Sequence, residues 1–258
     1  MRIETVTADR HDFMRFLAQD EIRNAFALYD LEEEAERVEC HAAIEAGSFG
    51  GYLLAWHGRQ HPNVLMTGTE EAARTLLPRA PPSPCTFLLA PDLVAAVEGK
   101  REIGARRRMY FMTVDSMAFR SVEGERPARL GEEDAKELKV LYRAAVEEPR
   151  DWGDWARKGL AYGIWRKGRL VAVAGTHFVA RRYSLIGGVY TDPRFRRRGF
   201  AASLTSAVTR DALQRSDQVG LMVVSTNQAA IRLYEKLGYR KGVEWVWLDS
   251  GTGHVPLA

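Results

Sequence analysis

The sequence predicts a mixed α/β fold, in which strands of a sheet alternate with flanking helices in both halves of the chain. Short apolar runs such as 52–56 and 170–177 have the length and composition of strands. Segments such as 132–146 instead repeat apolar residues at helical spacing. Hydrophobic residues make up 46% of the 258 positions and charged residues 28%, so the chain has enough apolar surface to bury a core.

The first half of the chain combines helices and strands. Gly50-Gly51 opens an extended run, and prolines between 78 and 84 make a rigid break before the next strand. In chain order, we expect a helix over 20–46, strands over 52–56 and 64–67, a helix over 70–77, a strand over 86–89, a helix over 91–97 and a strand over 109–114.

The polar stretch 121–127 marks a boundary, which divides the chain into domains over 1–120 and 127–258. After it the periodic patterns become clearer. In chain order, we expect a strand over 128–130, a helix over 132–146, a hairpin of strands 162–165 and 170–177, a strand over 183–190, a helix over 200–213, a strand over 220–224, a helix over 227–237 and a strand over 243–248.

Charge and cysteine content exclude several classes of protein. A formal net charge of only +3 permits an anionic ligand but does not favour nucleic acid. Cys40 and Cys85 lie far apart, without the paired spacing of a zinc site, so we predict two free thiols and no metal. No signal peptide is visible, and no run approaches the ~18 apolar residues of a membrane helix. We therefore expect a cytoplasmic protein without a membrane partner.

The segment 187–201 has the pattern of an anion-binding turn. A strand containing Gly187-Gly188 runs into a basic loop, and the loop opens an amphipathic helix through R-x-x-G-x-A at 196–201. The first amides of a helix lack intrahelical partners and lie at the positive end of its dipole. The small residues Gly199 and Ala201 let a pyrophosphate approach those amides. Neither a P-loop lysine nor a G-x-G-x-x-G fingerprint is present, so a solvated basic turn is the alternative.

This segment resembles the coenzyme A motif of the GNAT N-acetyltransferase superfamily. Residues 227–239 resemble a second motif of that family, and the two occur in the family's order. The resemblance covers roughly 127–250 and implies a mixed, mostly antiparallel twisted sheet flanked by helices, with acetyl-CoA (coenzyme A) as cofactor.

The first half resembles the degenerate N-terminal partner of two-domain members of the family. Its nearest match to the phosphate motif, 101–106, ends in Arg106 where a small residue is needed. The match also leads into the strand expected over 109–114 rather than into a helix, so it offers no converging amides. We therefore expect no cofactor in the first half.

The resemblance implies which residues contact the cofactor. The strand splays from its neighbour near the paired glycines, so that its backbone is free for the pantetheine arm, and Asn227 both caps a helix and contacts that arm. The expected cofactor-binding residues are Val189, Tyr190, Thr191, Arg196, Arg197, Arg198, Gly199, Phe200, Ala201, Asn227, Ala230 and Tyr234.

Tyr234 is the expected general acid, because a tyrosine at this position of the family protonates the departing thiolate. Periodicity alone would make it a core aromatic residue. Many relatives carry a glutamate two residues before the paired glycines, but this chain has Leu185. His177 is the expected general base instead, with Glu147 or Glu148 and a structural histidine as alternatives.

These residues predict an N-acetyltransferase that moves an acetyl or acyl group to a primary amine. A non-catalytic acyl-CoA sensor and a tRNA-dependent aminoacyl transferase are the alternatives, and the modest charge disfavours the latter. We expect the acceptor to be a small-molecule or peptide amine. We expect the chain to form a monomer or a homodimer. Trp152, Trp155, Asp151 and Asp154 lie in the loop region that borders the acceptor in relatives, or they are packing residues.

Overall fold

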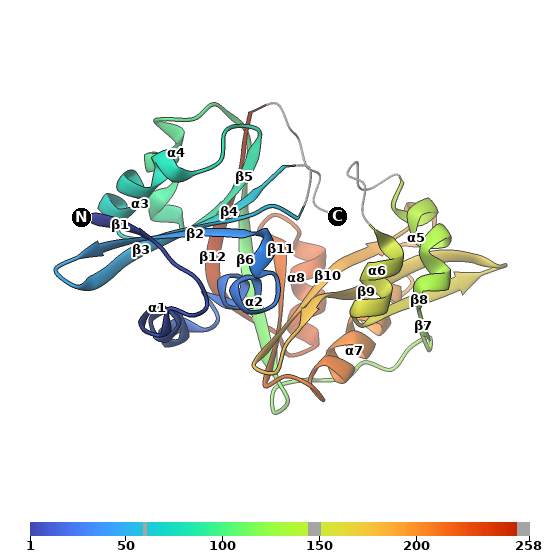
Figure 1. Cartoon of the computed structure of the whole chain (residues 1–258). Coiled ribbons are helices and arrows are strands. Elements are labelled where there is room, and N and C mark those ends of the chain that lie inside the picture. Colours follow the sequence, from blue (N-terminus) through green and yellow to red (C-terminus); the bar gives the residue numbers. More distant parts are fainter. Residues whose placement is uncertain (59–60, 144–150, 252–258) are drawn as a thin grey trace. The chain divides into compact units, whose positions relative to one another are not determined.

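The chain forms two compact units in a computed structural model that describes residues 1–58, 61–143 and 151–251 (Figure 1). The first unit is Met1–Met109 together with the segment that begins at Val243, and the second is Tyr110–Gly242. These bounds differ from the expected 1–120 and 127–258, because the last strand returns to the first unit.

The first unit contains strands paired in the order β1-β2-β3-β4-β5-β12, with all neighbours antiparallel except β4 and β5. Its strands are β1 (Arg2–Thr5), β2 (Val38–Glu45), β3 (Ser48–Trp56), β4 (Asn63–Gly68), β5 (Cys85–Leu89) and β12 (Arg240–Ser250). Strand β6 (Ile103–Asp115) begins in the first unit and extends into the second. Its helices are α1 (His11–Leu17), α2 (Ala25–Glu33), α3 (Glu70–Leu76) and α4 (Val94–Glu98), with short 3₁₀ turns between them.

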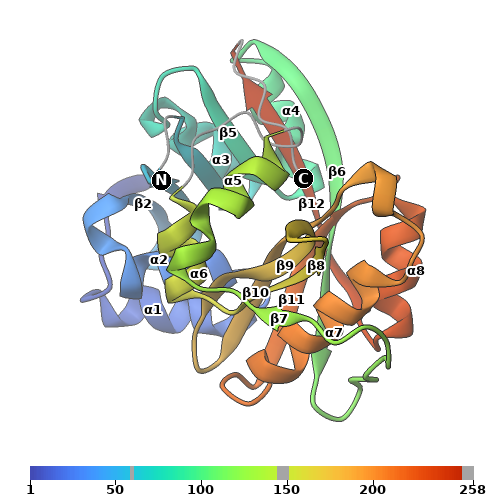
Figure 2. The same cartoon turned by 90° about the vertical axis from the view of Figure 1, so that its right-hand side faces the viewer.

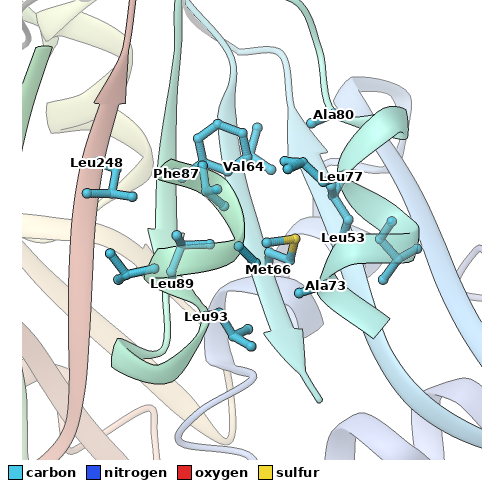
Figure 3. Close-up of a cluster of buried hydrophobic side chains, with 14 of the residues drawn as sticks. Leu53, Val64, Met66, Ala73, Leu77, Ala80, Phe87, Leu89, Leu93 and Leu248 are labelled. Atoms are coloured by element: carbon cyan, nitrogen blue, oxygen red, sulfur yellow. The ribbon is translucent and has the colours of Figure 1, made fainter. Parts of the chain in front are cut away.

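Alternation along β3 gives the first unit two apolar layers. Leu53 points into a buried apolar cluster with Met66, Phe87 and the helices α3 and α4 (Figure 3). The neighbouring Tyr52 points to the other face, where its ring meets Phe13 of α1 with centroids 5.7 Å apart. The sheet is therefore covered on both sides.

Strand β12 is fastened to the first unit by a buried carboxylate. Asp249 is 1% exposed and accepts hydrogen bonds from Thr86 of β5 at 3.2 Å and from the indole of Trp247 at 3.0 Å. Arg107 of β6 lies 3.3 Å from its second oxygen. A buried carboxylate is tolerated only with such partners, so these contacts tie β12 to β5 and to the first-unit part of β6.

The prediction of a helix over 20–46 is wrong in its second half, because helix α2 ends at Glu33 and strand β2 begins at Val38. Residues 40–44 are all buried, and β2 pairs with β1 on one side and β3 on the other. A strand buried on both faces lacks the alternation of apolar and polar residues that identifies a strand in sequence. Pairing with β1 and β3 therefore makes this segment a strand, although its local pattern does not predict one.

The second unit pairs its strands in the order β11-β10-β9-β8-β7, and only β10 and β11 are parallel. The strands are β7 (Ala128–Arg129), β8 (Ala161–Arg166), β9 (Arg169–Val179), β10 (Tyr183–Thr191) and β11 (Gln218–Val224). The helices are α5 (Ala135–Tyr142), α6 (Trp152–Lys158), α7 (Phe200–Ala212) and α8 (Gln228–Lys236). The prediction of a mixed, mostly antiparallel sheet flanked by helices is confirmed.

Helices cover both faces of this sheet (Figure 2). Helices α5 and α6 pack through Leu138, Tyr142 and Trp152 on one face. Helices α7 and α8 pack through Leu204 and Ile231 on the other. Within the described residues, no helix is both long and apolar enough to cross a membrane.

A half-buried carboxyl group on α2 makes the stability of the fold dependent on pH. Burial of Asp30, helped by the negative charge of Glu34, raises the pKa of its carboxyl from 3.8 to about 7. The folded state therefore holds this proton more tightly than the unfolded chain does. The stability that this group contributes is present below about pH 4 and is lost as the pH rises through about 7.

The variant Asp30→Asn cannot ionise and should escape this loss. Its free energy of unfolding, relative to wild type, should be higher at pH 8 than at pH 4.5 by more than about 1 kcal/mol. Urea denaturation at the two pH values measures the difference. A variant whose stability runs parallel to wild type at both pH values would contradict the assignment.

Candidate active site

Strand β10 separates from β11 part-way along its length. The two strands pair from Tyr183 with Gln218 to Ile186 with Leu221. In the part of the chain that the structure describes, residues 187–191 have no partner in β11, although β10 continues to Thr191. We call 187–191 the open edge. Its backbone groups on that side are available to a ligand that adds as a strand does.

A bulge on the β9 side accompanies the open edge. Gly187 pairs with Gly175 and Tyr190 with Val173, so one residue of β9 lies opposite Gly188 and Val189. Gly188 has a φ of +62°, a conformation that glycine adopts at little cost. The hydroxyl of Tyr142 on α5 donates a hydrogen bond to the Gly188 carbonyl. The apolar repeat over 132–146 predicts Tyr142 on the apolar face of its helix but gives no sign of this contact.

The turn after β10 presents the N-terminus of α7. Gly199 precedes the first helical residue with a φ of +80°, and the helical ladder begins with the Ser203 amide bonded to the Gly199 carbonyl. Among the described residues, no backbone acceptor faces the amides of 197–201. A side-chain carbon added at Gly199 would meet no atom within 4 Å. The turn therefore combines free amides with open space, as an anion site requires.

The arginines of this turn differ in how they are engaged. Arg194 pairs with Asp192 at 2.7 Å, and the Nε of Arg196 donates to the Thr191 carbonyl at 3.1 Å. Arg198 lies over the ring of Phe195, 5.3 Å from its centroid. Within the described ranges, Arg197 and Arg198 have no carboxylate partner, and both are exposed. These two guanidinium groups are the ones free to meet a phosphate.

Helix α8 carries the second group of predicted residues. Asn227 caps the helix, accepting a hydrogen bond from the Ala230 amide at 3.1 Å, which confirms its capping role. Tyr234 is 7% exposed and lies 6.0 Å from the ring of Tyr239. Burial raises the pKa of Tyr234 to about 12. Its hydroxyl therefore holds its proton throughout the physiological pH range, as a proton donor must.

Four of the predicted residues meet in one apolar cluster on the α7 and α8 face. Phe200 and Tyr234 are buried in it, and Val189 and Ala230 pack against it. Tyr190 points to the other face, where its ring lies 5.6 Å from that of Tyr142. The open edge thus presents its side chains to both faces.

The predicted base, His177, lies on β9 beside the open edge. Its side chain is exposed, and a side-chain carbon built on Gly187 would lie 2.0 Å from the imidazole Nε2. Gly187 therefore makes room for the ring. Leu185 is 1% exposed, so no carboxylate occupies that position. Glu147 and Glu148 lie outside the described residues.

The segment expected to be a loop beside the acceptor is instead helix α6. Asp151 caps it by accepting from the Asp154 amide at 2.9 Å, and Asp154 pairs with Lys158 at 3.0 Å. Trp152 stacks face to face on Tyr142, with centroids 4.1 Å apart. Trp152 is therefore a packing residue and Asp151 a helix cap. An aspartate cap and a buried aromatic ring both favour a helix over an open loop.

A surface cavity of about 450 Å³ reaches the open edge on the α5 side. Tyr190 and Leu141 supply part of its apolar wall, and Glu137, Lys136 and Arg169 are charged groups at its border. Its volume suits a small ligand.

Comparison with known proteins matches residues 161–248 to the family model described as FR47-like protein. A solved protein assigned to the GNAT acetyltransferase family, from Novosphingobium aromaticivorans, is 25% identical, covers 86% of this chain and 93% of its own, and superposes with a TM-score of 0.61.

These two matches support an assignment of the chain to the GNAT superfamily. Its likeness to other GNAT structures is one of fold. A GCN5-related N-acetyltransferase from Kribbella flavida is 18% identical over 90% of this chain and 97% of its own, with a TM-score of 0.67. A tandem GNAT protein from the clavulanic acid biosynthesis pathway is 12% identical over 98% of this chain and 99% of its own, with a TM-score of 0.57.

The two-unit arrangement of this chain is consistent with the fold of that tandem protein. A search of curated proteins finds no match.

Proposed function

We propose that this GNAT protein is an N-acetyltransferase that moves an acetyl group from acetyl-CoA to a primary amine. The observation that carries the proposal is that the open edge runs directly into a helix N-terminus with free amides. One extended ligand with an amide-bearing arm and a pyrophosphate matches both features in that order.

The residues of the site fit coenzyme A. The amides of 197–201 and the side chains of Arg197 and Arg198 would hold the pyrophosphate. Val189, Tyr190 and Thr191 of the open edge would hold the pantetheine arm, together with Asn227. Gly199 leaves the space that a phosphate needs, since no atom lies within 4 Å of the position a side chain would take.

Acetyl-CoA supplies an acyl group activated as a thioester, which a neutral amine attacks directly. The amide of Val189 would donate a hydrogen bond to the thioester oxygen, where negative charge develops. Tyr234 would protonate the leaving sulfur, because its raised pKa keeps the hydroxyl protonated. His177 would take the proton from the attacking amine, either directly or through water.

We expect the amine to enter through the cavity on the α5 side. The amides and free arginines at the α7 N-terminus are the site for the pyrophosphate, whereas the cavity borders Tyr190 and carries a carboxylate, Glu137. The lining also holds Asp192 and three cations, Lys136, Arg169 and Arg194, so the cavity does not favour a cationic amine over a neutral one.

A screen of amines and amino acids with acetyl-CoA, read out by release of free thiol, tests this function. Thiol release that depends on one class of amine supports the transferase. Tight binding of acetyl-CoA without thiol release for any amine would contradict it and would favour an acyl-CoA sensor.

The variant Gly199→Val should lose coenzyme A affinity by about tenfold or more, because a branched side chain would enter the pyrophosphate space. The positive φ adds a conformational cost of roughly 1–2 kcal/mol. Gly47→Val is the matched control, since Gly47 has a φ of +81° and equally open surroundings in a turn of the first unit. Calorimetry that finds equal affinity for both variants would exclude this phosphate site.

The variant Tyr234→Phe should lower turnover by about 10² or more while acetyl-CoA affinity changes little, because the lost proton donor acts during breakdown. Tyr239→Phe is the control, since it removes the hydroxyl of a neighbouring buried tyrosine that bonds Thr209 at 2.8 Å. Comparable turnover of the two variants would make Tyr234 a packing residue.

A further inference from the structure

The hydrogen bond from Tyr142 to Gly188 joins a helix to the bulge of the open edge. Tyr142 is 1% exposed, and the other core residues of α5, Leu138 and Leu141, are apolar. Packing alone would be served by a phenylalanine. The buried hydroxyl therefore marks a contact that is specific to the backbone of the bulge.

This contact fixes the orientation of one peptide plane. The peptide between Gly188 and Val189 is trans, so its C=O and N–H point in opposite directions. Neither residue has a partner in β9, and neither has one in β11 among the described residues. The sheet therefore does not set this plane. Holding the Gly188 carbonyl toward α5 aims the Val189 amide away from α5.

Two tryptophans hold the tyrosine ring in place. Trp152 stacks on it with an interplanar angle of 7°, and Trp155 meets Trp152 edge to face with centroids 5.8 Å apart. A side-chain carbon at Gly188 would lie 2.7 Å from the Tyr142 hydroxyl and 3.3 Å from the Trp155 ring. The three rings thus close on the bulge from the α5 side and place the Tyr142 hydroxyl at the Gly188 carbonyl.

We propose that Tyr142 is a positioning residue, which turns the Gly188–Val189 peptide so that the Val189 amide donates to the thioester oxygen of acetyl-CoA. The proposal rests on the proposed function, because it assigns the amide its ligand. Tyr142 itself touches no reacting atom. Its effect passes through one planar peptide, and a preorganised donor of this kind is worth more than one that must reorient during the reaction.

The test uses the carbonyl resonance of [1-¹³C]acetyl-CoA bound to the full-length protein, which moves downfield when the oxygen accepts a hydrogen bond. This readout needs no acceptor amine. Tyr142→Phe should lose at least half of the shift that wild type shows on binding. Tyr162→Phe is the matched control, because it removes another tyrosine hydroxyl of the second unit, one that donates to Asp211, and it should keep the full shift.

The same variants are then compared in turnover. Tyr142→Phe should lower kcat by about tenfold to a hundredfold, with the acetyl-CoA dissociation constant within about twofold of wild type. That constant also shows that the variant is folded. A merely structural role would change thermal stability in both variants and would leave the carbonyl shift unchanged.

The outcomes separate the two proposals. A Tyr142→Phe spectrum that matches the Tyr162→Phe spectrum, with wild type binding and turning over acetyl-CoA, overturns the role of Tyr142 alone. Failure of wild type to bind acetyl-CoA overturns the proposed function, and the role of Tyr142 with it. A reduced shift together with reduced kcat supports both.

Discussion

The separation of β10 from β11 after Ile186 is the feature on which the candidate site depends. A strand that loses its neighbour leaves a row of backbone donors and acceptors that need other partners. Here the loss coincides with a bulge toward β9, so Gly188 and Val189 have no partner in β11 among the described residues and share one opposite residue of β9. One carbonyl of that pair is taken by Tyr142. The remaining groups are what the proposed ligand would bind.

The paired glycines serve this opening for different reasons. At Gly187 any side chain would collide with the imidazole of His177, whereas at Gly188 the obstacles are a positive φ and the Tyr142 hydroxyl. Gly199 differs from both, because open space surrounds it. Gly187 and Gly188 thus leave space that side chains of the protein fill, whereas Gly199 leaves space for a ligand.

Features encoded within a short stretch of sequence could be predicted. The strand, basic turn and helix over 187–201 follow one another along the chain, and Asn227 caps the helix that it precedes. Capping and helix dipoles act over a few residues, so their signals survive in the sequence.

Features that depend on distant contacts could not be predicted. Tyr142 meets Gly188 across 46 positions, and only the folded sheet brings them together. Strand β2 lacks the alternation typical of a strand because it is buried on both faces. The resemblance to relatives places 151–155 in a loop and gives no sign of helix α6. The return of β12 to the first unit rests on Asp249, whose partner Thr86 is 163 residues away.

Hydrogen–deuterium exchange with and without acetyl-CoA tests the central claim most directly, because it reports on each stretch of backbone separately. The account predicts slower exchange in peptides that cover 187–201 and the start of α8, with no protection over 101–115, where the first half has its nearest match to the phosphate motif. Protection confined to the first unit, or none over 187–201 at saturating acetyl-CoA, would contradict it.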